Sequence, residues 1–158
     1  MGNKLIAYFS VTGTTADVAV RMAKAAKLDL YEIRPQVAYV VPEDLNWSDK
    51  TSRTTLEMTN LDSRPAIEDR DARIEKYDTV FLGFPIWWWI APTIINTFLD
   101  RYDFAGKKIV LFATSGGSGF GKAIENLKRS APDANFVEGR VFKSDVSDEE
   151  LKAWTDSY

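Results

Sequence analysis

The sequence predicts an α/β protein built on a three-layer, doubly wound sheet of five parallel strands. Short apolar runs alternate along the chain with longer stretches in which apolar residues recur every three or four positions. Such alternation is typical of parallel strands joined by right-handed helical crossovers, with helices on both faces of the sheet. The length of 158 residues suits one domain, and no repeat or linker divides it. We therefore expect a single domain over residues 1–158.

Each expected element has its own pattern. The strands are the apolar runs over residues 5–9, 28–34, 77–84, 108–113 and 136–142. The helices carry one apolar stripe each and cover residues 14–27, 91–102, 119–130 and 148–154. Pro92 suits the first turn of a helix, and Ser147 suits an N-cap. The polar segment 35–73 has the weakest pattern, and there we expect one helix over residues 49–58 with Ser48 as its cap.

Composition excludes several classes of function. The chain has no cysteine, which rules out disulfides, thiolate metal sites and cysteine nucleophiles. It also has no histidine, the usual general base and the commonest metal ligand. Nucleophilic triads and zinc hydrolysis are therefore poor interpretations, and we expect no metal. The formal net charge of −3, without a lysine or arginine cluster, predicts that the protein does not bind nucleic acid.

One uncharged stretch, residues 79–99, has enough residues to cross a bilayer. Pro85 and Pro92 divide it into a strand-like piece and a piece with a one-sided apolar stripe. We therefore expect a strand, a loop and a helix, and no membrane segment. The apolar run near the N-terminus is too short for a signal peptide, so we expect a cytoplasmic protein.

The loop Ser10–Thr15, directly after the first strand, predicts an anion site. It carries hydroxyl side chains and one glycine and then starts a helix, whose free N–H groups and positive dipole end attract anions. It contains neither the Gly-x-Gly-x-x-Gly of dinucleotide folds nor the Gly-Lys-Ser/Thr of nucleoside triphosphate loops. We expect one terminal phosphate monoester, held by hydroxyls and amides without a lysine. The alternative is an ordinary Ser/Thr cap that serves only the helix.

Two further loops leave the carboxyl ends of strands, where open parallel sheets bind ligands. Residues 85–92 contain three consecutive tryptophans, and residues 114–121 are rich in serine and glycine. Indoles offer stacking surfaces, and a glycine-rich turn lets backbone groups reach the edge of a ring. The three loops together predict a planar ligand with a phosphate tail. Alternatively, the indoles pack in the core and the glycine-rich turn is a simple connection; we expect one or two tryptophans to pack and at least one to meet the ligand.

Three motifs in this order resemble the flavodoxin-like family, in particular its short bacterial branch. They are Ser-x-Thr-Gly-x-Thr at 10–15, Tyr-Asp-x-x-Phe-Leu-Gly-Phe-Pro-Ile-Trp-Trp at 77–88, and Thr-Ser-Gly-Gly-Ser-Gly at 114–119. The likeness spans nearly the whole chain. It implies the sheet order 2-1-3-4-5 and a non-covalently bound flavin mononucleotide, FMN.

The resemblance also implies which residues hold FMN. Those that would hold the phosphate are Ser10, Thr12, Gly13, Thr14 and Thr15. Those that would flank the isoalloxazine ring are Pro85, Ile86, Trp87, Trp88 and Trp89. Those that would meet its other side or the ribityl chain are Thr114, Ser115, Gly116 and Gly117. We expect Trp87 or Trp88 to stack on the ring and Trp89 to turn toward the following helix.

These residues predict an FMN-dependent electron carrier that works between a reductase and an acceptor. Many flavodoxin carriers have a glycine in the ring loop and a strongly acidic surface, whereas residues 87–89 contain no glycine and the net charge is mild. An NAD(P)H-dependent quinone or small-molecule reductase is therefore the alternative. The expected partner is a redox protein for the carrier and NAD(P)H for the reductase. A flavin-free binding module on the same fold is a third possibility.

Overall fold

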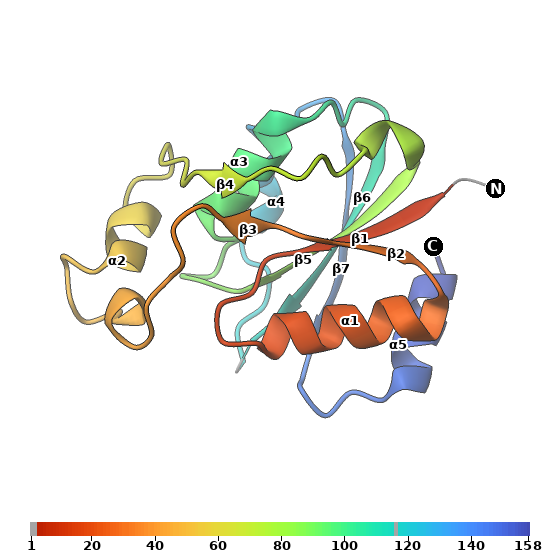
Figure 1. The fold of residues 1–158 in the computed structure, drawn as a ribbon, viewed down its shortest axis with the longest axis horizontal. Helices are drawn as coiled ribbons and strands as arrows, with labels where there is room; N and C mark the ends of the chain where they lie inside the picture. Colours follow the sequence, from red (N-terminus) through yellow and green to blue (C-terminus); the bar gives the residue numbers. More distant parts are fainter. Residues whose placement is uncertain (1–2, 116) are drawn as a thin grey trace.

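In the computed structural model, which describes residues 3–115 and 117–158, a parallel sheet forms the centre of the molecule (Figure 1). Its strands are β1 (Lys4–Tyr8), β2 (Asp29–Glu32), β5 (Thr79–Pro85), β6 (Lys108–Thr114) and β7 (Asn135–Phe142). They lie in the order β2-β1-β5-β6-β7. Counted within this sheet, the order is 2-1-3-4-5, which confirms the predicted fold.

Helices cover both faces of the sheet, and α1 and α5 lie together on one of them (Figure 1). The helices are α1 (Thr14–Ala26), α2 (Arg53–Met58), α3 (Thr93–Arg101), α4 (Ala123–Lys128) and α5 (Asp148–Asp156). Single 3-10 turns, η1 (Glu43–Leu45) and η2 (Ile74–Lys76), occur between them. The face opposite α1 and α5 is covered by α3 and α4.

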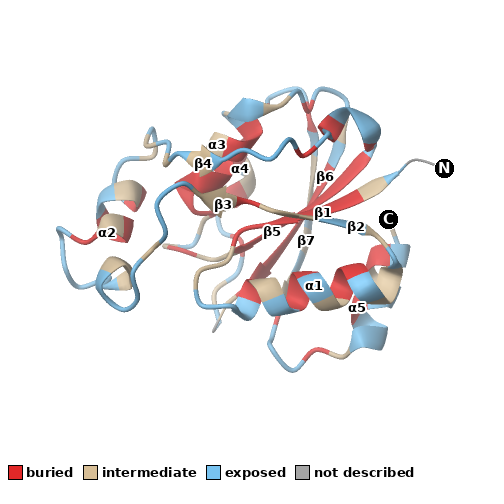
Figure 2. Ribbon diagram, in the orientation of Figure 1, coloured by how far each residue is buried: buried red, intermediate tan, exposed pale blue. Residues whose placement is uncertain are grey.

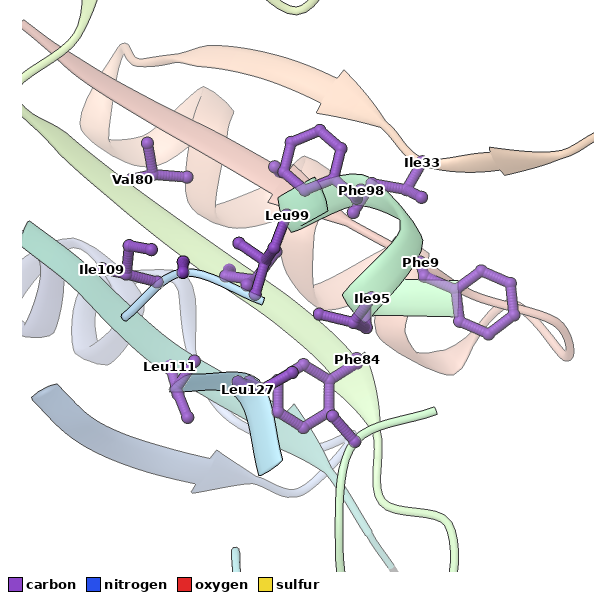
Figure 3. Packing of buried hydrophobic residues seen from close by; sticks show 14 of the residues in the cluster. Phe9, Ile33, Val80, Phe84, Ile95, Phe98, Leu99, Ile109, Leu111 and Leu127 are labelled. Atoms are coloured by element: carbon purple, nitrogen blue, oxygen red, sulfur yellow. The ribbon is translucent and has the colours of Figure 1, made fainter. Parts of the chain in front are cut away.

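A hydrophobic core lies between each face of the sheet and the helices that cover it. Because side chains alternate along a strand, Leu5 joins the core beneath α3 and α4, while Ile6 joins the core beneath α1 and α5. Figure 3 shows the first core, in which Phe84, Ile95 and Leu127 come from a strand and both helices. Burial is concentrated along the central strands (Figure 2). The carboxyl ends of β1, β5 and β6 are therefore held in place by tightly packed, buried strands.

The predicted helix over residues 49–58 starts later than expected. α2 begins at Arg53, and its cap is Ser52, whose hydroxyl accepts a backbone N–H of the first turn; Ser48 as the cap is wrong. The Asp49 carboxylate instead accepts the backbone N–H two residues on, at 2.8 Å. Such a local bond holds the chain in a turn and competes with helix formation.

The predicted helix over residues 119–130 is also shorter than expected, because α4 covers only Ala123–Lys128 and turns at residues 121–122 and 129–130 flank it. Gly121 has a φ of +53°, in the left-handed region that ends or precedes a helix more readily than it continues one. A Cβ at this position would lie 2.3 Å from the carbonyl oxygen of Trp89. The glycine therefore allows the loop before α4 to pack against the tryptophan loop.

The uncharged stretch 79–99 forms β5, a loop and most of α3, as predicted. Within residues 3–115 and 117–158, no helix is both long enough and apolar enough to cross a membrane.

Residues 36–66 form an excursion from the sheet, and this segment is called the 36–66 excursion below. It starts after β3 (Arg34–Pro35) and ends before β4 (Ile67–Glu68), which pair with each other as short antiparallel strands. In Figure 1 it projects at the left with α2, beyond the ends of the strands. The sequence predicts one helix in this polar segment. The structure shows that α2 is only part of the ordered excursion, which also contains η1.

Candidate functional site

The loop between β1 and α1 presents an open helix start. Gly13 is the N-cap of α1, has a φ of +95° and offers no side chain to cap the first turn. By contrast, Ser147 caps α5 through its hydroxyl. A Cβ at Gly13 would meet no atom within 4 Å, so the backbone conformation, and not crowding, requires glycine. The first N–H groups of α1 therefore remain available to an anion.

The predicted phosphate residues divide by position. Thr12 and Thr14 line a cavity of about 620 Å³. Thr15 is buried, and its hydroxyl is hydrogen-bonded to that of Thr114 at 2.7 Å, so it joins the loop to β6. The Ser10 hydroxyl accepts the Gly13 N–H at 3.2 Å and shapes the loop.

The same cavity contains a residue that sequence reasoning missed. Lys143 and Asp145, from the loop after β7, line it together with Thr12 and Thr14. The expectation of a phosphate held without a lysine stays a prediction, because Lys143 and Asp145 bring one positive and one negative side chain to the same lining. No motif indicates Lys143. The fold of the sheet brings it close to the loop after β1, which is far away in the sequence.

The loops after β5 and β6 are joined where they leave the sheet. The Ile86 N–H donates to the Thr114 carbonyl oxygen at 3.1 Å. Pro85, Thr114 and Ser115 line the 620 Å³ cavity. The Ser115 hydroxyl also accepts two backbone N–H groups of its own loop, those of Gly117 at 3.2 Å and Ser118 at 2.8 Å. Gly116, a predicted site residue, lies outside the described residues.

The three tryptophans form a tight hairpin turn. Trp87 and Ile90 exchange two backbone hydrogen bonds, of 3.0 and 3.1 Å. Between them, Trp88 and Trp89 have φ values of +53° and +63°. A two-residue turn with both central residues left-handed usually contains asparagine and glycine, and bulky residues there are outliers. The turn therefore holds two indoles in an unfavourable backbone conformation.

The tryptophans differ in exposure. Trp87 is 4% exposed and packs edge-to-face against Phe9, with ring centroids 5.6 Å apart. Trp88, the other predicted stacking residue, lines a cavity of about 440 Å³ together with Ile86 and Trp89. Trp89 is 68% exposed, so most of its side chain is open to solvent, and its expected turn toward the following helix stays a prediction. The left-handed turn directs it to the surface.

The 36–66 excursion supplies an aromatic residue that the sequence motifs did not indicate. Trp47 lines the 440 Å³ cavity, with its ring centroid 5.7 Å from that of Trp87 and 6.2 Å from that of Trp88. In the sequence, Trp47 is distinguished only as a tryptophan in a largely polar segment. The residues that line this cavity carry no charge among the described parts of the chain.

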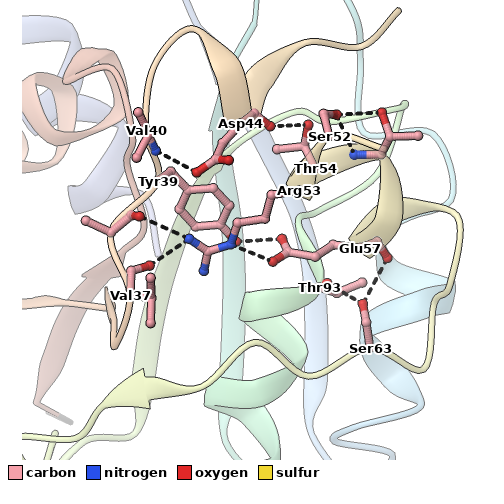
Figure 4. Close-up of polar contacts among 12 residues, drawn as sticks. Val37, Tyr39, Val40, Asp44, Ser52, Arg53, Thr54, Glu57, Ser63 and Thr93 are labelled. Atoms are coloured by element: carbon pink, nitrogen blue, oxygen red, sulfur yellow. Dashed lines mark hydrogen bonds and ion pairs between the residues drawn. The ribbon is translucent and has the colours of Figure 1, made fainter. Parts of the chain in front are cut away.

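A polar cluster supports this aromatic wall (Figure 4). Tyr39 packs edge-to-face on Trp87 at 5.6 Å and donates its hydroxyl to Glu57 Oε1 at 2.6 Å. The Arg53 guanidinium lies 3.6 Å from the centre of the Tyr39 ring and pairs with Glu57 Oε2 at 3.1 Å. Burial, and then the bond to Glu57, raise the pKa of Tyr39 far above its ordinary value. The phenol therefore stays protonated and fixed.

Comparison with known proteins gives one family. A family model described as flavodoxin matches residues 3–158. A solved candidate flavoprotein from Bacteroides eggerthii is 44% identical, with a TM-score of 0.90 and 99% of this chain and 98% of that chain covered. No curated protein sequence matches.

Two more distant structures share the fold. A Lactobacillus acidophilus flavoprotein, solved in complex with FMN, is 20% identical, with a TM-score of 0.69 and 98% of this chain and 99% of that chain covered. Oxidised flavodoxin 2 from Bacillus cereus is 16% identical, with a TM-score of 0.57 and 99% of each chain covered.

Proposed function

The chain belongs to the flavodoxin family, and we propose that it binds FMN and carries electrons between a reductase and a redox partner protein. The observation that supports this most is the pairing of two unlike cavities at one edge of the sheet. One is polar and bordered by the open start of α1, and the other is aromatic and uncharged. FMN has the same division between a phosphate and a planar ring.

The residues of the polar cavity suit the phosphate. The Thr12 and Thr14 hydroxyls and the free N–H groups of α1 are hydrogen-bond donors, and hydrogen bonds to a charged group are the stronger kind. Lys143 and Asp145 also line this cavity, so its charged side chains are one cation and one carboxylate. This donor set fits a phosphate monoester better than a bulky, neutral group.

The residues of the aromatic cavity suit the ring. Trp88 offers an indole face, while Ile86 and Ser118 complete an uncharged lining. Bound FMN would supply the electron-transfer chemistry, and the protein would set its affinity and its access to partners.

A second function is an NAD(P)H-dependent reductase of quinones or other small molecules. The exposure of Trp47 and Trp89, at 44% and 68%, favours it, because an open aromatic rim would let a planar acceptor reach the ring. The carrier and the reductase differ in whether they need a second protein.

The visible spectrum of freshly purified protein tests the cofactor. Flavin absorption bands that survive gel filtration are expected; a protein that stays colourless after FMN is added would contradict FMN binding. With FMN bound, a carrier should oxidise NAD(P)H only when a separate reductase is supplied. Steady NAD(P)H oxidation by the protein alone would replace the carrier with the reductase.

A further inference from the structure

We infer that the 36–66 excursion closes the ring side of the FMN site, with Trp47 as a ring-contacting residue and Arg53 as the residue that positions it. This inference rests on the proposed binding of FMN, and it assigns a role to a segment outside the three sequence motifs. Its starting point is the position of Trp47, which belongs to the excursion but lines the cavity of Trp88 and Ser118.

The exposure of Trp47 separates it from its aromatic neighbours. Trp87, at the centre of the cluster, is 4% exposed and has its faces taken up by packing. Trp47 touches the same cluster but keeps 44% of its surface exposed. An indole fixed on one side and open toward an uncharged cavity on the other is suited to stacking on a planar ring.

The backbone beside Trp47 is held in place. The buried Ser52 side chain donates to the Asn46 carbonyl oxygen at 2.8 Å, directly before Trp47. Ser52 also caps α2, so the tryptophan and the helix are fixed relative to each other. The position of Trp47 is therefore set by the folded excursion and does not depend on the tryptophan hairpin alone.

Arg53 connects this helix to the rest of the wall. Its guanidinium donates to the carbonyl oxygens of Val37 at 2.7 Å and Ala38 at 3.2 Å, pairs with Glu57 and lies over Tyr39 (Figure 4). Lysine could keep the charge but not the planar fork that makes these contacts together. We therefore assign Arg53 a positioning role that acts through Tyr39 and the aromatic cluster.

Titration of FMN and riboflavin tests the role of Trp47. Trp47→Leu should raise both dissociation constants by the same factor, roughly five- to a hundredfold for the loss of one stacking face, and should relieve part of the flavin fluorescence quenching. Trp47→Phe keeps a ring and should fall between Trp47→Leu and wild type. The control is Trp154→Leu, because Trp154 packs against Phe81 on the opposite face of the sheet. It should leave quenching intact.

The outcomes separate this inference from the proposed function. Wild-type protein that binds neither flavin would overturn both. Normal FMN binding by wild type, together with Trp47 variants whose dissociation constants and quenching stay within twofold of it, would overturn the role of Trp47 alone. A loss for FMN but not for riboflavin would also overturn it, since Trp47 would then act on the phosphate end.

Arg53 is tested in the same titrations. Arg53→Met should weaken both flavins and reduce quenching, and Arg53→Lys should restore only part. Arg64→Met is the matched control, because Arg64 also makes one ion pair, to Asp100 at 2.7 Å, and donates to two nearby carbonyl oxygens, but it lies outside the aromatic cluster. Arg53 has no specific positioning role if the Arg53→Met protein quenches flavin fluorescence as strongly as wild type does. The same conclusion follows if Arg64→Met weakens flavin binding and quenching as much as Arg53→Met.

Discussion

Neighbouring hydroxyls in one short loop have different roles. Thr12 lines the polar cavity, whereas Thr15 is 2% exposed and hydrogen-bonded to Thr114. The family resemblance implies that both residues hold the phosphate, whereas in the structure Thr12 borders the cavity and the Thr15 hydroxyl is already bonded within the fold. This difference can be measured, because binding and stability are affected separately.

Thr12→Ala should weaken FMN by about 1.5 to 3 kcal/mol, the range for a hydrogen bond to a charged group, and should weaken riboflavin much less. Thr15→Val should instead lower the stability of the apoprotein by about 1 to 3 kcal/mol, since it leaves the buried Thr114 hydroxyl without its partner. Flavin titration and urea unfolding of both variants check this. Equal losses for both flavins in Thr12→Ala would show that the loop does not read the phosphate.

Tyr77 makes the stability depend on pH in the alkaline range. Burial, and then the hydrogen bond from its hydroxyl to Asp29 Oδ2 at 2.8 Å, raise the pKa of Tyr77 to about 12. The unfolded chain loses this proton near pH 10, so the stabilisation is complete below pH 10 and is lost as the pH rises through about 12. Unfolding of Tyr77→Phe and wild type at pH 8 and pH 11.5 should show a smaller alkaline loss in the variant. An equal loss would contradict the assignment.

At the scale of elements, the tryptophan hairpin combines a strained backbone with an exposed side chain. Trp88 and Trp89 both occupy the left-handed region, and the Trp89 carbonyl oxygen is packed closely against Gly121. Left-handed non-glycine residues cost on the order of 1–3 kcal/mol each and persist only where their surroundings hold them. The sheet end and the loop before α4 provide those surroundings here.

Trp89→Gly should therefore unfold at higher urea concentration than Trp89→Ala, with a difference of about 1 kcal/mol, because only glycine adopts this conformation without strain. The alanine variant is the matched control: both lose the exposed indole, and they differ only at Cβ. Equal stabilities would show that the turn relaxes without cost when the indole is removed.

The elements also show how far sequence patterns reach. The strands were predictable because central parallel strands are buried on both faces, so that β5 appears as an uninterrupted apolar run. The start of α2 was not predictable, because the Asp49 carboxylate accepts the Thr51 N–H and this local bond competes with helix formation. The loops after β1, β5 and β6 could be predicted from motifs, but Trp47 and Lys143 enter the cavities only through tertiary packing.

For the whole molecule, the arrangement separates stability from binding. The two cores lie along the sheet and hold the fold, whereas both cavities lie at the carboxyl ends of the strands. The opposite end of the sheet is closed by contacts of its own, such as the Asp78 N–H with the Asn3 carbonyl oxygen at 2.9 Å. A ligand at one end therefore has no direct contact with the other.

FMN should stabilise the whole domain but protect only one end of it from hydrogen exchange. At 100 times its dissociation constant, FMN adds about 2.7 kcal/mol, which for a chain of 158 residues corresponds to a rise in Tm of about 5–10 °C. Under conditions in which exchange occurs by local opening, amides of residues 10–16, 86–90, 115 and 117–118 and those near Trp47 should exchange more slowly. The amides of residues 76–79 and 106–108, at the far end, serve as the internal control. Equal protection at both ends would mean that FMN acts through global stability alone and would contradict a site confined to the carboxyl edge.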